Sequence, residues 1–215
     1  MSGIMLNVVG GTFAPALPVI GSALGGGFFA GQIDQSGTIY NLVVGPKASA
    51  DRPNSPPPFN QFKIADTNDA GATSVIDGPS NSASMNDASH PAAEFCEGLT
   101  IGGFSDWYLP AKNELEVCYY NLKPTTTSNN TSSGINANAV PARTSNYTTG
   151  TPAQTSATDF QSSGTEFFGS NRYWTSTQAS ATDGYAHHFN DGFQMNYIPK
   201  SNYAQRIRAI RRVAA

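Results

Sequence analysis

The stretch Gly103-Phe104-Ser105-Asp106-Trp107-Tyr108-Leu109-Pro110, followed by Asn113-Glu114-Leu115, decides the fold of this chain. Its glycine turns the backbone, its aromatic residues form a short strand, and its proline ends that strand before a helix that runs to about residue 122. A second stretch, Tyr173-Trp174-Thr175-Ser176-Thr177, predicts another strand. Together they predict a strand, a turn and a helix in mid-chain and a β-meander at the end.

The tryptophans of these two stretches are predicted to be core residues rather than platforms for sugar rings. We expect each indole N–H to donate to a backbone carbonyl. Asp106 and Glu114 could form a catalytic carboxylate pair, but a structural role is favoured. Asp106 would hold the turn, and Glu114 would lie in the first helical turn or beside a terminal arginine. The candidate structural residues are Trp107, Leu109, Pro110, Glu114, Trp174 and Arg208.

The meander supplies the candidate ligand-binding surface. Segments 184–189 and 193–197 flank an Asn190-Asp191-Gly192 turn, and alternating arginine and apolar residues from 206 to 213 predict a strand that closes the sheet. Rings and amides make adaptable contacts. The candidate ligand-binding residues are Tyr185, His187, Asn190, Phe193, Asn196 and Tyr197.

No metal site, cofactor or catalytic residue is predicted. Neighbours on a strand face opposite sides, so His187 and His188 cannot share one ion. Asp183 and Asp191 could bind calcium, but repeated acidic spacing is missing. The sequence also has no phosphate-cradling glycine loop before a helix and no serine elbow.

The N-terminal third is predicted to contain an arm and a hairpin. Residues 1–30 carry no charge and many glycines and prolines. They lack the basic start of a signal peptide, and they are too broken for a membrane helix. We expect this arm to dock on a partner or a second copy, the alternative being a disordered tail. Residues 31–65 form a hairpin lead-in, with strands at 28–33 and 38–44 and a short edge strand at 62–64.

Residues 66–215 are predicted to be the main domain. Residues 66–88 read as small and polar, which favours a surface loop, and an apolar stripe predicts a helix over 89–98. Cys96 and Cys118 lie on apolar stripes, which favours two buried thiols; a bridge between them stays open. Residues 124–172 form a long loop that is either functional or disordered.

Composition excludes some partners. Only 13 % of the 215 residues are charged, about half of the usual ~25 %. The surface is therefore polar through hydroxyls and amides, as in many extracellular and virion-surface proteins. The formal net charge of −3 gives no footprint for nucleic acid.

The motifs quoted above resemble those of Lcl-type C-terminal domains, in their order and spacing, over roughly residues 85–213. That resemblance implies an α+β, C-type-lectin-like fold, with two helices packed on a small twisted antiparallel sheet and long irregular loops. It is similar in architecture to the major tropism determinant of phages and to formylglycine-generating enzymes. Tyr108 stands where the family usually has arginine, and Thr175 and Gln178 replace the commoner serine and glutamate. The cysteines lie outside any oxidase motif, so that activity is not carried over.

The resemblance implies a phage tail-fibre or tail-tip protein, located in the virion and made in the host cytoplasm. Its lectin-like domain would bind a host surface glycan or outer-membrane protein. Residues 1–30 would join it to other tail proteins or to its copies in a homotrimer. The alternative is a purely structural virion component. A glycan-cleaving enzyme would need two convergent carboxylates in a cleft, for which the sequence offers no good pair.

Overall fold

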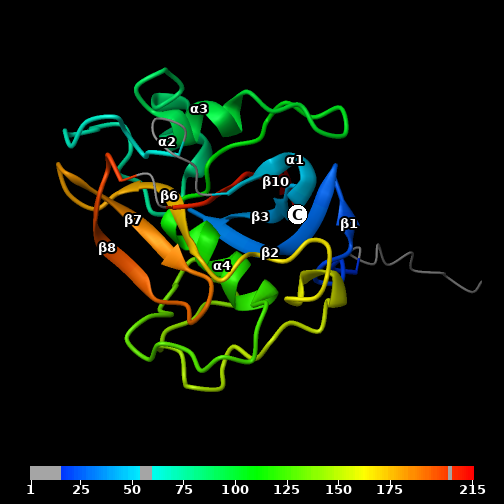
Figure 1. The fold of residues 1–215 in the computed structure, drawn as a ribbon. Helices are drawn as coiled ribbons and strands as arrows, with labels where there is room; N and C mark the ends of the chain where they lie inside the picture. Colours follow the sequence, from blue (N-terminus) through cyan, green and yellow to red (C-terminus); the bar gives the residue numbers. More distant parts are fainter. Residues whose placement is uncertain (1–15, 54–59, 203–204) are drawn as a thin grey trace, which may run out of the picture.

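The computed structural model describes residues 16–53, 60–202 and 205–215. Half of the predicted arm, residues 1–15, and the proline-rich residues 54–59 lie outside the described residues. The protein is a mixed α+β structure with antiparallel sheets and few, short helices (Figure 1). The helices are α1 (Lys47–Ala50), α2 (Gly78–Ser84), α3 (Pro91–Glu97), α4 (Lys112–Leu122) and the 3₁₀ turn η1 (Thr158–Phe160).

The largest sheet joins the two ends of the chain. Its strands follow the order β1-β2-β3-β10, and β5 pairs with β2 further along that strand than β1 does, at Gln32 and Ile33. The bounds are β1 (Ala23–Leu24), β2 (Gly27–Gln35), β3 (Thr38–Val44), β5 (Ala139–Val140) and β10 (Ile210–Ala214). The predicted hairpin is confirmed as β2 and β3. Ser36 and Gly37 connect the two strands with φ values of 53° and 90°, as a tight two-residue turn requires.

The C-terminal strand lies elsewhere than the sequence predicted. The meander is present as β6 (Arg172–Gln178), β7 (Asp183–His188) and β8 (Gln194–Pro199). Of the residues 206–213 predicted to close this meander, only Arg206 does so, through a single parallel bridge to Tyr173 of β6. The rest of the prediction is wrong, because β10 pairs with β3, with Ile210 opposite Val44. Before it, β9 (Ile207–Arg208) pairs with β4 (Asp51–Arg52). Residues 31–65 therefore share sheets with the end of the chain.

Helix α4 joins the two sheets. It packs on β2 and β3 and on β6 and β7, and Figure 1 shows it in green between the meander and the blue sheet. The close approach to β2 occurs at Gly31, where an added Cβ would lie 2.3 Å from the Asn121 amide nitrogen. That amide donates to the carbonyl of Ala30 across 2.8 Å. The helix thus links the hairpin to the rest of the core.

Three local predictions are corrected by the structure. Residues 66–88 contain helix α2, which buries Asn81 and Ser82. No strand forms at 62–64, where Phe62 is buried edge-on against Trp174. The expected strand before Pro110 reduces to a single bridge between Tyr108 and Ile210.

The helices predicted at 89–98 and up to about residue 122 are present as α3 and α4. Cys96 and Cys118 are free, buried thiols in two different hydrophobic clusters. Within the described ranges, none of the helices is long and apolar enough to cross a membrane.

Candidate functional site

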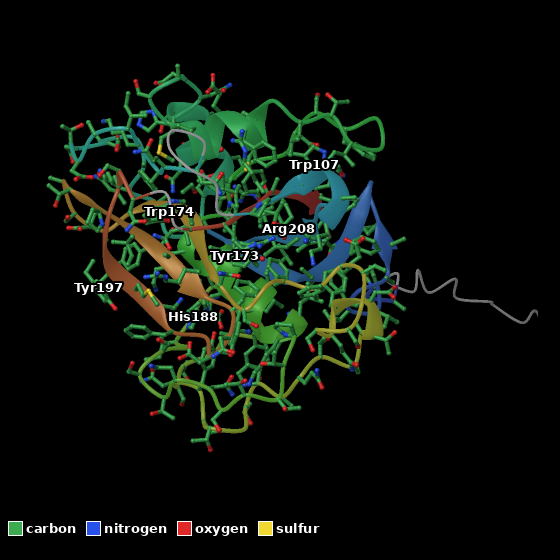
Figure 2. All side chains as sticks on the ribbon, in the orientation of Figure 1. Trp107, Tyr173, Trp174, His188, Tyr197 and Arg208 are labelled. Atoms are coloured by element: carbon green, nitrogen blue, oxygen red, sulfur yellow. The ribbon has the colours of Figure 1, made fainter. Side chains whose placement is uncertain are left out.

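Trp107 and Trp174 belong to the frame. Both are fully buried (Figure 2). The Trp107 indole donates to the carbonyl of Phe104 at 3.0 Å, and the Trp174 indole donates to that of Asn60 at 2.7 Å. This is the arrangement expected for core packing, and it leaves neither ring face open to a sugar.

Glu114 is fully buried and its carboxyl group is held by three partners. Its carboxylate accepts the backbone N–H of Ala111 and the hydroxyl of Tyr108, each at 2.8 Å, and lies 3.4 Å from the Arg212 guanidinium. Burial raises its pKa to about 7, although the arginine and the two donors favour the charged form. Tyr108 therefore supplies a hydrogen bond to this carboxyl group.

Two aspartates converge on a surface hollow of about 330 Å³, lined also by Tyr40 and Tyr108. Asp77 pairs with Arg212 at 2.6 Å. Asp106 forms a two-pronged pair with Arg211 at 2.7 and 2.8 Å, and these hydrogen bonds lower the pKa of the aspartate. A carboxylate held ionised by arginine is a poor general acid. The geometry of this hollow therefore fits a fastening of the terminal strand.

Arg208 lies at the centre of a buried ion network. Its guanidinium donates to the carbonyl of Gly45 at 2.8 Å and contacts the carboxylates of Asp51 at 3.3 Å and Glu166 at 3.1 Å. Asp51 also pairs with Arg206 at 2.7 Å. Figure 2 shows Arg208 in the interior, between the two sheets. These charges fasten β9 to β4 and to the end of the long loop.

The structure divides the six candidate ligand-binding residues. Asn196 and Tyr197 are exposed, with 58 % of Tyr197 open to solvent, while Tyr185, Asn190 and Phe193 are half-buried. His187 does not belong to the surface, which corrects the prediction. Only 1 % of it is exposed, and its ring lies 5.0 Å from that of Tyr119. Burial, with Lys112 and His188 nearby, lowers its pKa to about 3.

A β-bulge explains why two consecutive residues of β8 both face outward. Gly184 pairs with Ile198 and Ala186 pairs with Met195, so Tyr185 alone faces the two residues between them on β8. Those residues are Asn196 and Tyr197. Bulges break the strict alternation of a strand and re-aim side chains. Figure 2 shows Tyr197 at the outer rim of the meander.

The long loop is anchored on Glu116, a fully buried residue of α4. Its carboxylate accepts the amide of Asn136 at 2.6 Å and the hydroxyl of Tyr147 at 2.7 Å, and it pairs with the Arg143 guanidinium. Each of these three residues comes from the loop. A buried charge is retained only where such partners satisfy it, so the loop folds around this carboxylate.

Lys123, just after α4, is a second anchor. The residue is only 2 % exposed. Its ammonium group donates to the Asn129 side-chain oxygen at 2.7 Å and to the carbonyl of Thr127. Asn129 in turn donates to the carbonyl of Pro152 and accepts the Tyr119 hydroxyl. Residues 124–172 are therefore ordered by buried polar groups rather than by an apolar core of their own.

The loop and the meander turn meet in space. The N–H of Asn130 donates to the carbonyl of Asp191 at 2.7 Å, and the N–H of Gln194 donates to the Ser133 hydroxyl at 3.0 Å. Figure 1 shows the loop running below α4 and β8. The two regions that the sequence proposed separately thus form one continuous face.

Glu116, Lys123 and Arg143 were missed by the sequence analysis. The sequence did contain a signal for Glu116. Its neighbours in the middle of α4 are apolar or aromatic, so this helix is buried on every side and any acid within it must find partners.

Comparison with known proteins adds no relative: no family model, no curated protein and no solved structure matches this chain.

Proposed function

We propose that this protein is a phage tail-fibre or tail-tip protein whose domain has a C-type-lectin-like fold and binds a receptor on the host cell surface. The fold proposal is supported by α4 packed on a curled antiparallel sheet and by the long irregular segment of residues 124–172. The receptor is a glycan or an outer-membrane protein. The protein binds it without catalysis.

The observation that carries this proposal is the bulge of β8. It turns Asn196 and Tyr197 outward from a three-stranded sheet held in place by buried tryptophan, and Tyr185 faces them across the strand pair. Phe193 lies 6.5 Å from the Tyr197 ring, between centroids. Aromatic and amide groups on a rigid support lose little entropy on binding.

A second feature supports attachment to another protein. Leu17 and Val19 are 64 % and 76 % exposed, and a groove of about 420 Å³ runs between residues 16–18, Leu24 and Val213. Apolar side chains that stand open on a polar protein favour a partner there. The expected arm of residues 1–30 is shortened at its end, because residues 23–24 and 27–30 belong to β1 and β2. The arm before β1 then joins the domain to tail proteins or to its copies in a homotrimer, and several copies raise weak binding by ~10²–10⁴.

The same groove favours the alternative of a structural virion component that recognises nothing. In that role the aromatic side chains of residues 185–197 would be covered by a neighbouring subunit. The exposure of Tyr197 in the described chain favours recognition.

The test is adsorption of the labelled full chain to a panel of bacterial strains. The double variant Tyr185→Ala with Tyr197→Ala should reduce adsorption at least about five-fold, the loss expected for removing about 1 kcal/mol of contact. The control, Ile39→Ala, removes an exposed apolar side chain of β3, outside the meander, and should adsorb normally. Equal adsorption of all three proteins would remove the meander as the receptor contact.

A further inference from the structure

The long loop encloses a hollow that the meander surface does not include. Tyr120 of α4 and loop residues 143–148 line a space of about 300 Å³. That volume is at the lower end of the ~300–1,000 Å³ typical of small-molecule pockets. It suits a single sugar ring rather than an extended chain or a folded peptide segment.

One wall of the hollow is rigid and partly aromatic. The guanidinium of Arg143 lies 4.1 Å above the Tyr120 ring, and the Tyr147 ring centroid is 6.4 Å from that of Tyr120. Arg143 and Tyr147 are both fixed from behind by the buried carboxylate of Glu116. The wall is therefore formed before any ligand arrives, which reduces the entropy lost on binding.

The hollow carries no net charge. Among the described residues that line the hollow, Arg143 is the only charged one, and its charge is balanced by the ion pair with Glu116. A sialic acid, uronic acid or phosphate would find no uncompensated cation to offset its lost hydration. A neutral ligand does not have this cost, because it has no charge to desolvate.

The lining of the hollow also offers unused hydrogen-bonding groups. Thr144, Ser145 and Asn146 are exposed, and their side chains make no hydrogen bond with the described part of the chain. Two hydroxyls and an amide provide both donors and acceptors at close quarters. Sugar hydroxyls, which also donate and accept, are the matching chemistry.

We propose that this hollow binds one neutral pyranose residue, a hexose or an N-acetylhexosamine, at an exposed end of a cell-surface glycan. The inference rests on the proposed function and gives its ligand a chemical class. Tyr147 connects the two surfaces, because its ring also lies beside Gly192 in the meander turn.

The experiment is saturation-transfer NMR on the full chain with methyl glycosides of mannose, galactose and N-acetylglucosamine, beside those of sialic and glucuronic acid. A monosaccharide of this size should bind with a Kd on the order of 1 mM. The double variant Thr144→Ala with Asn146→Ala should weaken binding at least about five-fold, since hydrogen bonds are lost. Its amide spectrum shows whether the fold is kept.

Thr149→Ala is the control, because Thr149 is an exposed residue of the same loop outside the hollow. It should bind like the unaltered protein. Binding of neutral glycosides that the double variant loses and Thr149→Ala keeps supports the inference. Three outcomes overturn the inference. The protein prefers the acidic sugars, the double variant binds as well as the unaltered protein, or no glycoside binds at 100-fold the expected Kd, about 100 mM.

The outcome separates this inference from the proposed function. Adsorption to cells that depends on Tyr185 and Tyr197, without any glycoside binding, defeats the sugar site and leaves receptor binding standing. Glycoside binding lost in the double variant, without adsorption to any strain, supports the sugar site and defeats receptor binding by the meander.

Discussion

The hydroxyl of Tyr147 donates to the carboxylate of Glu116 across 2.7 Å, and neither residue is more than 5 % exposed. Burial, with the carboxylate beside it, raises the pKa of the Tyr147 phenol well above its ordinary value, so the phenol stays protonated and remains a donor. This single contact ties the most polar segment of the chain to the most buried helix. Glu116 is therefore one of the two buried anchors of the loop, beside Lys123.

Replacing Glu116 by glutamine should loosen the loop selectively. Arg143 loses its counter-charge while staying mostly buried, which should cost about 2–3 kcal/mol. Hydrogen exchange should accelerate at the Tyr147 N–H, which donates to the Ser133 carbonyl, and stay slow at the Trp174 N–H in the meander. Asp159→Asn, at an exposed acid, is the control and should change neither rate. Equal acceleration at both sites would mean that Glu116 supports the whole fold.

Replacing Asp51 by asparagine should destabilise the entire protein. Arg206 and Arg208 would then both lose the carboxylate that they share. Water cannot replace it at Arg208, because the Arg208 side chain is fully buried. Breaking a buried ion pair costs about 3–5 kcal/mol. For a chain of this size, a loss of about 3 kcal/mol lowers the Tm by roughly 6–12 °C. Thermal unfolding by circular dichroism measures the shift. A Tm within 2 °C of the Asp159→Asn control, about 1 kcal/mol or less, contradicts this role.

Acid should weaken the fold through His187. Its pKa falls from 6.5 to about 3 on folding, because the ring is buried. The unfolded chain therefore binds a proton first as pH falls below 6.5, and the stability present above that pH is lost progressively towards pH 3. The slope from this residue is at most about 1.4 kcal/mol per pH unit.

His187→Phe tests this sign. The variant removes two ring nitrogens that have no hydrogen-bond partner among the described residues. It should be as stable as the unaltered protein at pH 7 and more stable at pH 4.5. Urea unfolding at the two pH values measures the difference. A parallel loss of stability in both proteins would show that another group controls the acid limb.

Gly192 should tolerate no side chain. Its φ is +78°, and an added Cβ would lie 2.4 Å from a ring carbon of Tyr119 and 2.8 Å from one of Tyr147. Gly37 has a φ of +90°, and an added Cβ there would have nothing within 4 Å. A side chain at Gly37 would therefore meet the same backbone strain but no steric clash. Gly37→Ala should therefore cost about 1 kcal/mol and Gly192→Ala about 2–4, because overpacking adds to strain. Similar urea midpoints for the two variants would contradict a steric role for Gly192.

Both thiols should be inert in the native protein. Cys96 and Cys118 are free and fully buried, and burial raises the pKa of each thiol above its ordinary value. Ellman's reagent should react with neither until denaturant is added, and then with both. Fewer than two thiols after unfolding would point to a disulfide, and rapid reaction beforehand to an open interior.

Local patterns predicted the elements that are built from neighbouring residues. Gly37 between two β-rich runs gave the hairpin, and the stripe that includes Leu115 and Cys118 gave α4. Helix α2 has no such stripe; it forms because the buried Asn81 amide donates to the carbonyl of Ser74 and because the Ser82 hydroxyl accepts the Leu109 N–H. Those partners are distant or lie in irregular chain, and no periodicity announces them.

The proposed recognition surface was predictable in composition but not in geometry. Asn196 and Tyr197 were chosen as a ring and an amide, but strict alternation puts only one of them on a given face. The bulge opposite Tyr185 depends on the register of two strands, which the sequence of either one does not determine. His187 was misplaced because the ring of Tyr119, which covers it, comes from α4, far away in the sequence.

The pairing of β10 with β3 has a consequence for biosynthesis. Leu42, Val43 and Val44 are fully buried in the finished sheet, yet the strand that completes it comes from residues 210–214. On the ribosome, the edge of β3 that pairs with β10 must stay unpaired until residues 210–214 have been translated. Pairing between strands that are far apart in the sequence is slow, and until it occurs the unpaired strand edge can aggregate. A nascent chain of this protein should therefore need a holding chaperone until its last strand emerges from the exit tunnel.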